Sequence, residues 1–457
     1  MSPILPMSET WSDYLRDESK LMGSAESISF PKTEEEICEI VREMHQNSIP
    51  VTIQGGKTGI TGAAVPVRGH ILNLSEFHGV LDFCTDGDTY LLTVRAGTRL
   101  DEMNKEIARL NAPVRLFWPP QPTETTATVG GAIATGASGI QSFGYGDSKQ
   151  YIHSLRVLTA GGTIAEMNAD QLETYWGSEG MLGLILSVTL KLLPIPEEQW
   201  GIGFFFPDRQ LAWQFADFIQ KRDALSPTAV VTVAEYMDRR AIDLVEEHKS
   251  QMSKLDDIPM VPEDADAMIY LEISGEESGI EEAAGILMEV AAELESDPDQ
   301  AWAVSGESEL ESMRIFRHAI PETANLVVEQ NHRTSGCITK LSTDYGFANL
   351  KFSRMMNWYE EQMQDWNTRK IVFGHIGGSH VHWNFFPESE AEYQECLARL
   401  NTLGLNIRIQ GGCAAQENGF GKLKKRWIPI ENYRMGMMRT KKQQLDPQNF
   451  WNPENYF

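Results

Sequence analysis

Cysteine is scarce in this chain, and no two cysteines have the spacing of a metal-binding or redox motif. Five cysteines are scattered through 457 residues, at positions 38, 84, 337, 396 and 413. This argues against a disulfide framework and against an iron–sulfur cluster bound by the chain itself. A small, odd and dispersed set of cysteines is typical of a reducing compartment. We therefore expect a cytoplasmic protein, or one held at the inner face of a membrane through a partner.

Positive charge and long apolar runs are also in short supply. Lysine and arginine number 39 against 65 acidic residues, which gives a net charge of -26. Such a surface repels nucleic acid and anionic lipid, so an anionic substrate needs a local basic site. The longest apolar run, Met181 to Leu190, is too short to span a bilayer. No charged-then-apolar signal segment is visible at the N-terminus.

A chain of this length exceeds one ordinary hydrophobic core, so at least two domains are expected. The proline pair at 194 and 196 marks the main boundary. We expect an N-terminal segment over 1–24, a first domain over 25–196, a second over 197–425 and a C-terminal segment over 426–457. Hydrophobic periodicity predicts an α+β fold, with helices at 31–48, 99–110, 208–222, 277–295, 347–366 and 388–403. The strand–helix alternation after residue 200 favours a ferredoxin-like α/β sandwich.

The first domain contains a glycine-rich loop directly after a predicted strand. It reads Gln54-Gly55-Gly56-Lys57-Thr58-Gly59-Ile60-Thr61-Gly62. Successive backbone N–H groups in such a loop can form a nest for phosphate oxygens. The spacing is neither that of a P-loop nor that of a Rossmann fingerprint. Taken alone, a plain multi-glycine turn is about as good an interpretation.

Three further segments change this interpretation. They are Trp118–Thr123 with Thr128–Ala137, then Phe143–Asp147, then Gly177–Ile185. In this order the set resembles the PCMH-type FAD-binding domain of the vanillyl-alcohol-oxidase superfamily, over roughly residues 25–196. The resemblance implies a two-subdomain FAD-binding fold, with the first loop and the Thr-Val-Gly-Gly segment around the pyrophosphate. The FAD-binding residues that it implies are Gly55, Gly56, Lys57, Thr58, Gly59, Thr61, Gly62, Pro120, Thr123, Thr128, Gly130, Gly131, Ala134, Thr135, Tyr145, Gly146, Glu179, Gly180, Gly183 and Ile185.

Some members of that superfamily tether the flavin to a histidine in or near the first loop. This chain has Lys57 and Thr58 there and no histidine. We therefore expect non-covalent FAD. The terminal Leu445-Asp446-Pro447 to Asn452-Pro453 segment also resembles the family, which implies that Asn452 touches the isoalloxazine; a proline-delimited surface tail is the alternative.

The second half holds three of the ten histidines within eight residues, at His375, His380 and His382. If the run is extended, the last two rings point to one face. Glycines 374, 377 and 378 allow a turn that brings His375 to the same side. Imidazole is both a common metal ligand and a proton acceptor near neutral pH. The alternative is a glycine-rich turn followed by a strand with surface histidines.

The pattern Gly-His-x-Gly-x-x-x-x-His resembles the C-terminal domain of the D-2-hydroxyacid dehydrogenases. That group includes D-lactate dehydrogenase, D-2-hydroxyglutarate dehydrogenase and the glycolate oxidase flavoprotein subunit. The resemblance implies a divalent metal such as Zn²⁺ on His375, His382 and Glu417. It also implies that a D-2-hydroxy acid is oxidised to the 2-oxo acid, with hydride passing to flavin N5.

The chain departs from this pattern at the expected base. The family has Glu-His-Gly where this chain reads Glu417-Asn418-Gly419, and an amide cannot accept the proton. The family tends to have asparagine where this chain has His380. His380 is then a replacement base, with His382 as the second catalytic candidate, and Asn418 becomes a substrate contact. Alternatively the site is altered and the native reaction differs, or His380 only donates a hydrogen bond.

Two cations are candidates for the substrate carboxylate. Arg317 lies in a segment that matches the family's substrate arginine, and Lys340 lies in one that matches its Lys-x-x-x-Asp strand. Arg314 competes with Arg317 from one turn away. For either residue alone, a surface charge paired with a nearby glutamate is nearly as good an interpretation.

These patterns favour FAD-dependent oxidation of a D-2-hydroxy acid, with D-lactate as the first substrate to test. The alternatives are an oxidase of a sugar or aromatic alcohol, and a flavoprotein subunit with an altered site. Without its own iron–sulfur cluster, the protein needs a separate acceptor: a quinone, a cytochrome, an electron-transfer flavoprotein or an iron–sulfur subunit. The basic tail, with Lys424 and Lys425, is either a docking patch for that partner or a lining for the pyrophosphate. A homodimer is an expected assembly.

Overall fold

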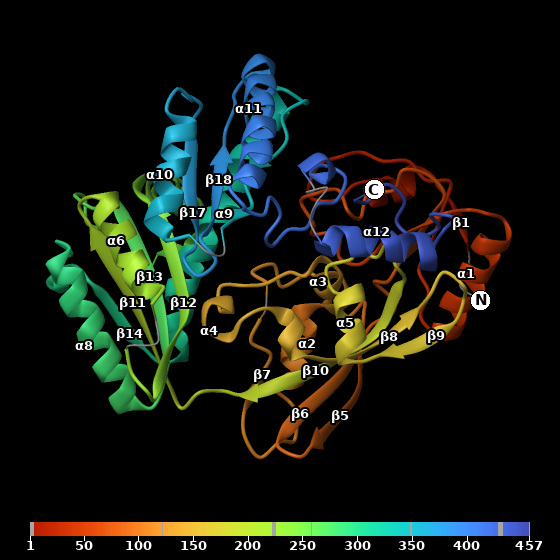
Figure 1. The fold of residues 1–457 in the computed structure, drawn as a ribbon, viewed down its shortest axis with the longest axis horizontal. Helices are drawn as coiled ribbons and strands as arrows, with labels where there is room; N and C mark the ends of the chain where they lie inside the picture. Colours follow the sequence, from red (N-terminus) through yellow and green to blue (C-terminus); the bar gives the residue numbers. More distant parts are fainter. Residues whose placement is uncertain are drawn as a thin grey trace. The chain divides into compact units, whose positions relative to one another are not determined.

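The computed structural model describes residues 4–120, 122–221, 225–256, 258–347, 350–427 and 433–456. The chain forms two compact units (Figure 1). Unit 1 comprises residues 1–139, 146–195 and 417–457, and unit 2 comprises residues 140–145 and 196–416. Two short segments thus group differently from the domains expected from sequence: 140–145 with unit 2 and 417–425 with unit 1. Local composition carries no information about such spatial grouping.

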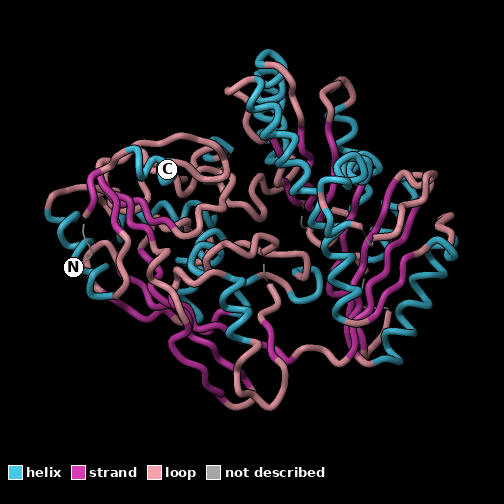
Figure 2. The backbone as a smooth tube through the Cα atoms, turned by 180° about the vertical axis from the view of Figure 1, so that it is seen from behind, coloured by secondary structure: helices cyan, strands magenta, loops and turns pink. Residues whose placement is uncertain are grey.

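Unit 1 contains two sheets (Figure 2). The smaller has the order β1-β2-β4-β3, with β2, β4 and β3 parallel. Its strands are β1 (Leu5–Pro6), β2 (Ser27–Ser29), β4 (His70–Asn73) and β3 (Val51–Gln54). Helix α1 (Glu34–Gln46) begins where the Thr33 side chain caps the Glu36 N–H, and buries Ile37, Ile40, Val41 and Met44.

The larger sheet of unit 1 is antiparallel, in the order β5-β6-β10-β8-β9, with β7 also paired to β10. Its strands are β5 (Val80–Asp86), β6 (Thr89–Arg95), β10 (Leu184–Pro194), β8 (Ile152–Leu158), β9 (Ile164–Met167) and β7 (Leu116–Phe117). The helices of unit 1 besides α1 are η1 (Glu9–Leu15), α2 (Leu100–Ile107), α3 (Val129–Thr135), η2 (Ser148–Tyr151), α5 (Ala169–Tyr175), η7 (Lys425–Trp427) and α12 (Tyr433–Leu445).

Unit 2 is built on one antiparallel sheet in the order β14-β11-β13-β12-β17-β18-β15, with β16 also paired to β18. Its strands are β11 (Glu198–Phe206), β12 (Ala229–Asp238), β13 (Ala267–Gly275), β14 (Trp302–Ser305), β15 (Leu341–Ser342), β16 (Tyr345–Gly346), β17 (Lys370–His375) and β18 (His380–Phe385). The first four strands have the order 4-1-3-2, with α6 after β11 and α8 after β13, and with α7 as an additional helix between β12 and β13. This is the ferredoxin-like arrangement, so that prediction is confirmed.

The helices of unit 2 are α4 (Ser142–Tyr145), α6 (Arg209–Ile219), α7 (Arg239–His248), η4 (Lys249–Gln251), η5 (Ser253–Leu255), α8 (Glu277–Glu293), η6 (Pro298–Gln300), α9 (Glu307–Thr334), α10 (Phe352–Met363) and α11 (Glu390–Ile409). Five of the six expected helices are shorter than predicted, among them 208–222, which is α6, and 347–366, which is α10, whereas 388–403 is α11 and extends to Ile409. Residues 222, 348 and 349 of those predictions lie outside the described residues. Sequence reasoning did not predict α9, whose buried face includes Met313, Phe316, Arg317 and Ile320. No described helix is long and apolar enough to cross a membrane.

Candidate functional site

The glycine-rich loop after β3 has a row of backbone N–H groups with no hydrogen-bond acceptor among the described residues. None of the N–H groups from Gly55 to Gly62 donates a hydrogen bond to another described residue. The loop also packs too tightly for side chains: a Cβ on Gly55 would lie 2.2 Å from Thr128 Oγ1, and one on Gly56 would lie 2.8 Å from Thr126 O. Amide donors without described partners, next to glycines that let a ligand approach the backbone closely, suit phosphate oxygens.

The Thr-Val-Gly-Gly segment packs against this loop, with Thr128 next to Gly55. Thr128 caps α3 by accepting from Gly131 N–H, while Gly130 N–H donates to Ala96 O at 2.8 Å. A Cβ on Gly130 would lie 2.5 Å from that of Ala96. These N–H groups are engaged within unit 1, so the free donors belong to the first loop.

The other predicted FAD-binding residues fall at several places. Ala134 O accepts from Glu179 N–H at 2.6 Å, and Thr135 Oγ1 donates to Gly131 O at 3.0 Å. Pro120, Gly183 and Ile185 are buried, and Thr123 and Gly146 are half-buried. Tyr145 ends α4 and groups with unit 2.

Glu179 is a buried junction of unit 1. Its carboxylate accepts from the N–H groups of Phe420 (2.7 Å) and Gly421 (3.0 Å). Burial raises the pKa of Glu179 to about 7, against the opposing effect of those donors and of Lys422. The carboxylate therefore fastens the 177–185 loop to the C-terminal segment.

Asn452 strengthens the same junction. Its Nδ2 donates to Glu179 O at 2.6 Å, and its Oδ1 accepts from Ile53 N–H at 2.7 Å. A Cβ on Gly180 would lie 2.7 Å from the Asn452 Nδ2 atom. Both ends of the amide are engaged within unit 1, and the isoalloxazine contact stays a prediction.

The basic tail is largely used inside unit 1. Lys422 Nζ donates to Gly62 O (3.2 Å) and to Asn455 Oδ1 (2.6 Å). Lys442 Nζ donates to Asp446 (2.6 Å) and to two backbone carbonyls, and the Arg434 guanidinium lies over the Trp176 ring. These cations hold the C-terminal segment against the glycine-rich loops.

In unit 2 the histidine run forms a hairpin rather than a turn followed by one strand. His375 ends β17 and His380 begins β18, and the two are cross-strand partners. Ser379, in the tight connection, has φ +43, and Gly374, within β17, has φ +145, a conformation that favours glycine. His380 and His382 are two apart on β18 and share a face. The ring centroids are 5.3 Å (His375–His380), 4.7 Å (His380–His382) and 5.6 Å (His375–His382) apart.

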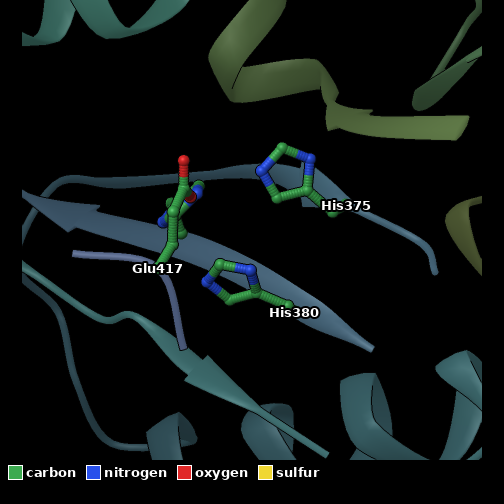
Figure 3. A group of neighbouring side chains, drawn as sticks. His375, His380 and Glu417 are labelled. Carbon is green, nitrogen blue, oxygen red and sulfur yellow. The ribbon is translucent and has the colours of Figure 1, made fainter. Parts of the chain in front are cut away.

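Glu417 completes this cluster. One ligand atom from each of the three histidines and one from Glu417 all lie within 4.8 Å of one another. Figure 3 shows His375, His380 and Glu417 gathered from separate stretches of chain. Glu417 is the first residue counted with unit 1, yet it follows Gln416, whose N–H donates to Asp344 O in unit 2 at 3.1 Å.

Each histidine is oriented by a hydrogen bond from its outer nitrogen. His375 Nδ1 bonds the Glu235 carboxylate, and His380 Nε2 bonds Asp344 Oδ1 at 2.7 Å. His382 Nδ1 lies 3.4 Å from Thr343 O. If these nitrogens carry the protons, His375 Nε2, His380 Nδ1 and His382 Nε2 keep lone pairs for a ligand. Three imidazoles and a carboxylate, with the rings fixed by outer acceptors, fit Zn²⁺ or a similar divalent ion.

The predicted substrate residues are placed differently from one another. Arg317 is buried (3% exposed) and donates through Nε to Glu235 Oε2 at 2.7 Å. Lys340 Nζ donates to Asn325 Oδ1 on α9 at 2.6 Å. Arg314 binds Glu272, and the Asn418 carbonyl accepts from Thr61 Oγ1 at 3.2 Å. Arg317 reaches the histidine cluster through Glu235, whose carboxylate also bonds His375.

Sequence reasoning missed Glu235. Burial opposes its ionisation, but His375 and Arg317 together lower the pKa of Glu235 to about 2. A signal was available: Glu235 interrupts the apolar strand Val-Val-Thr-Val-Ala-Glu-Tyr-Met, and a carboxylate in a buried strand needs a partner.

A cavity of about 240 Å³ lies beside His375 within unit 2. Its lining is mixed, comprising Ile140, Ser142, Phe143, Gln220, His375, Gly377 and Gly378. Among these described residues, His375 is the one with an ionisable side chain. The cavity therefore suits an uncharged group.

The sequence matches two family models. One, an FAD binding domain, covers residues 25–168, and the other, the C-terminal domain of FAD linked oxidases, covers residues 195–456. The chain belongs to the FAD-linked oxidases. The predicted family and fold class are therefore confirmed, FAD is the cofactor, and the protein is an oxidoreductase.

Two curated dehydrogenases resemble this FAD-linked oxidase over most of their length, and a third relative matches over about half of its length. It is 25% identical to a D-lactate dehydrogenase of Archaeoglobus fulgidus, covering 93% of this chain and 89% of the relative. It is 26% identical to a D-2-hydroxyglutarate dehydrogenase of Xanthomonas citri pv. viticola, covering 94% and 89%. It is 28% identical to the glycolate oxidase subunit GlcD of Escherichia coli, covering 56% and 49%.

Solved structures share the fold. Substrate-bound p-cresol methylhydroxylase matches with a TM-score of 0.74 at 13% identity, over 99% of this chain and 93% of that one. An alkyldihydroxyacetonephosphate synthase matches with a TM-score of 0.67 at 17% identity, over 95% and 77%. At these identities the likeness concerns the fold alone.

Proposed function

We propose that this FAD-linked oxidase oxidises a D-2-hydroxy acid to the 2-oxo acid. The observation that carries the proposal is the convergence of His375, His380, His382 and Glu417 in one cluster. Relatives named D-lactate dehydrogenase and D-2-hydroxyglutarate dehydrogenase support the substrate class. The cluster offers what oxidation of a hydroxy acid requires: ligands for a divalent ion that would hold the hydroxyl and carboxylate, and a group that can take the hydroxyl proton.

FAD, when bound, accepts the hydride from the carbinol carbon. In the proposal it is held non-covalently, and the free N–H groups of the Gly55–Gly62 loop bind its pyrophosphate. His375, His382 and Glu417 would hold a divalent ion, and that ion would supply Lewis-acid polarisation of the substrate oxygens.

His380 is the proposed proton acceptor. Asp344, which is 1% exposed, holds its Nε2, so the tautomer presents Nδ1 to the cluster. A buried carboxylate behind a histidine fixes its orientation and stabilises the imidazolium that forms, as in hydrolase triads. The proposed base thus lies on β18, opposite His375 on β17 and two residues before His382. It would take the place of the family histidine for which this chain has Asn418.

The other role open to His380 is that of a fourth metal ligand. The His380→Ala variant separates the two roles. A base predicts that Co²⁺ affinity is kept while flavin reduction slows, whereas a ligand predicts that both fall together. His153→Ala, at an exposed histidine on β8, is the matched control.

The cavity beside His375 favours a substrate with one carboxylate and an uncharged side chain. A second carboxylate placed there would be desolvated without a described cationic partner in the lining. D-lactate and its longer alkyl homologues should therefore be oxidised with higher kcat/KM than D-2-hydroxyglutarate. Gly377→Ala provides a check, because its Cβ would lie 2.7 Å from Phe143 Cδ2 and shrink the cavity; it should penalise longer side chains most.

The experiment that tests the function is anaerobic flavin reduction with a panel of D- and L-2-hydroxy acids. Bleaching by D- but not L-isomers supports the proposal. An oxidised spectrum that persists with every hydroxy acid, together with rapid peroxide formation from a sugar or aromatic alcohol, would instead support an alcohol oxidase.

The reduced flavin must pass its electrons to a separate acceptor. One similar protein is named a subunit, GlcD, which supports transfer to a partner. We keep a quinone, a cytochrome, an electron-transfer flavoprotein or an iron–sulfur subunit as candidates, with a cytoplasmic location. Neutralising Lys424 and Lys425 tests the docking patch: unchanged acceptor reduction would remove it from the proposal.

A further inference from the structure

Two strands and a helix of unit 2 bring Arg317, Glu235 and His375 into one chain of contacts. Glu235 lies on β12 and His375 on β17, and the two are cross-strand partners. Arg317 reaches the same carboxylate from α9: its Nε and Nη2 both lie 2.7 Å from Oε2, while His375 Nδ1 bonds Oε1. Each carboxylate oxygen thus has its own partner.

Burial makes this arrangement rigid. The Glu235 side chain is 0% exposed, and the Arg317 guanidinium lies over the Phe373 ring at 4.8 Å. A carboxylate removed from water must be compensated by fixed charges and hydrogen bonds. Arg317 supplies the charge from one side, so Glu235 stays ionised and accepts from His375 on the other.

From this geometry we propose that Glu235, held by Arg317, is the residue that sets His375 as a metal ligand. Resting on the proposed function, this makes Arg317 a positioning residue two contacts behind the metal ligand His375 rather than a binder of the substrate carboxylate. The hydrogen bond fixes the His375 proton on Nδ1 and aims Nε2 into the cluster. It also makes the imidazole a stronger donor, because the carboxylate polarises the ring.

A neighbouring pair provides the matched control. Glu272 on β13 is also 0% exposed and is bound by Arg314 of the same helix, at 2.7 and 2.5 Å. Its third partner is Tyr270 Oη at 2.7 Å, rather than a histidine. Glu272→Gln therefore reproduces the loss of a buried carboxylate without touching the metal cluster.

The test is Co²⁺ titration of the FAD-loaded protein by calorimetry and visible absorption, with Glu235→Gln compared with Glu272→Gln. We expect a 10- to 100-fold weaker Co²⁺ affinity in Glu235→Gln, the usual cost of losing an outer partner. Glu272→Gln should keep wild-type affinity. Glu235→Asp is the second variant, because it keeps the charge beside Arg317 but withdraws the carboxylate from His375; it should fold and still bind Co²⁺ more weakly.

The outcomes separate this inference from the proposed function. Wild-type affinity in both Glu235 variants, with normal binding by the parent protein, overturns the positioning role and leaves the metal site standing. Equal weakening in Glu272→Gln also overturns it, since the effect would then be general destabilisation. No Co²⁺ binding by the parent protein overturns the metal site itself.

Discussion

Two buried carboxylate–guanidinium pairs stand next to each other on the sheet of unit 2, and they differ in their third partner. Glu235 is opposite Tyr270 in the β12–β13 register, and Glu272 is two residues further along β13. Arg317 and Arg314 are one turn apart on α9. One pair ends at His375 and the other at Tyr270. The same kind of ion pair thus contacts a candidate metal ligand in one place and a tyrosine in the other. The residue that the carboxylate contacts besides arginine therefore decides whether the pair has a functional role.

The largest expected effect is on the rate of flavin reduction, and it comes from removing the proposed base, His380. His380→Ala should lower the rate of flavin reduction by D-lactate on the order of 10²- to 10⁴-fold, because proton transfer in the transition state is lost. Stopped-flow absorbance under anaerobic conditions measures the rate. His153→Ala should react like the parent protein, and an undiminished rate in His380→Ala would remove this histidine from catalysis.

The next effect tests whether the two pairs are equivalent in stability. Removing one partner of a buried ion pair costs about 3–5 kcal/mol, because the other charge is left uncompensated. Arg317→Met and Arg314→Met should therefore both lower the free energy of unfolding, measured by urea denaturation without metal. Arg314 is the more exposed of the two, at 21% against 3%, so its loss should cost less. A larger loss for Arg314→Met would contradict the burial argument.

Glu235 and Glu272 are buried next to arginines, whereas His70 is buried between two serine hydroxyls, and we expect it to stay neutral. His70 in unit 1 is fully buried between Ser27 Oγ (2.9 Å) and Ser29 Oγ (2.7 Å), and burial lowers its pKa to about 4. The unfolded chain then binds more protons than the folded one between about pH 4 and the ordinary histidine pKa. Stability should fall by about 3 kcal/mol as the pH drops through that window.

The variant His70→Asn checks this prediction. It removes the titrating group, so its unfolding free energy should depend less on pH than that of the parent protein across the same window. Equilibrium unfolding at a series of pH values measures the difference. Parallel pH profiles for the two proteins would show that His70 is not responsible.

The smallest effect concerns an exposed pair on the same helix as Arg314 and Arg317. Arg333 and Glu329 are 3.3 Å apart at i,i+4, with side chains 75% and 42% exposed. Because water screens such a pair, Glu329→Gln should change the free energy of unfolding by less than about 0.5 kcal/mol. A loss as large as that of the buried pairs would undo the distinction between them.

The sequence predicted the parts of this molecule that rest on local patterns. Hydrophobic periodicity predicted β12, β13, α1 and α8 closely, and the strand–helix alternation predicted the ferredoxin-like class of unit 2. The histidine spacing and glycines predicted that His375, His380 and His382 would meet. The long helix α9 escaped prediction because charged residues and Pro321 obscure the stripe formed by Leu310, Met313 and Phe316.

The partners of the histidines could not be predicted, because they come from distant segments. Glu235 precedes His375 by 140 residues, and Asp344 precedes His380 by 36. Nothing in the local sequence separates Arg317 as a substrate ligand from Arg317 as the partner of a buried glutamate. The register between β12 and β17 places Glu235 opposite His375, and register is a property of the folded sheet.

The most direct test of the metal-assisted oxidation is flavin reduction by D-lactate in protein treated with a chelator and then restored with Zn²⁺. Anaerobic stopped-flow absorbance follows oxidised FAD in both samples, with FAD content measured in parallel. Rapid bleaching in the restored sample and at least tenfold slower bleaching in the depleted one is the predicted result. Equal rates in the two samples, with FAD retained in both, would contradict a metal role for His375, His382 and Glu417.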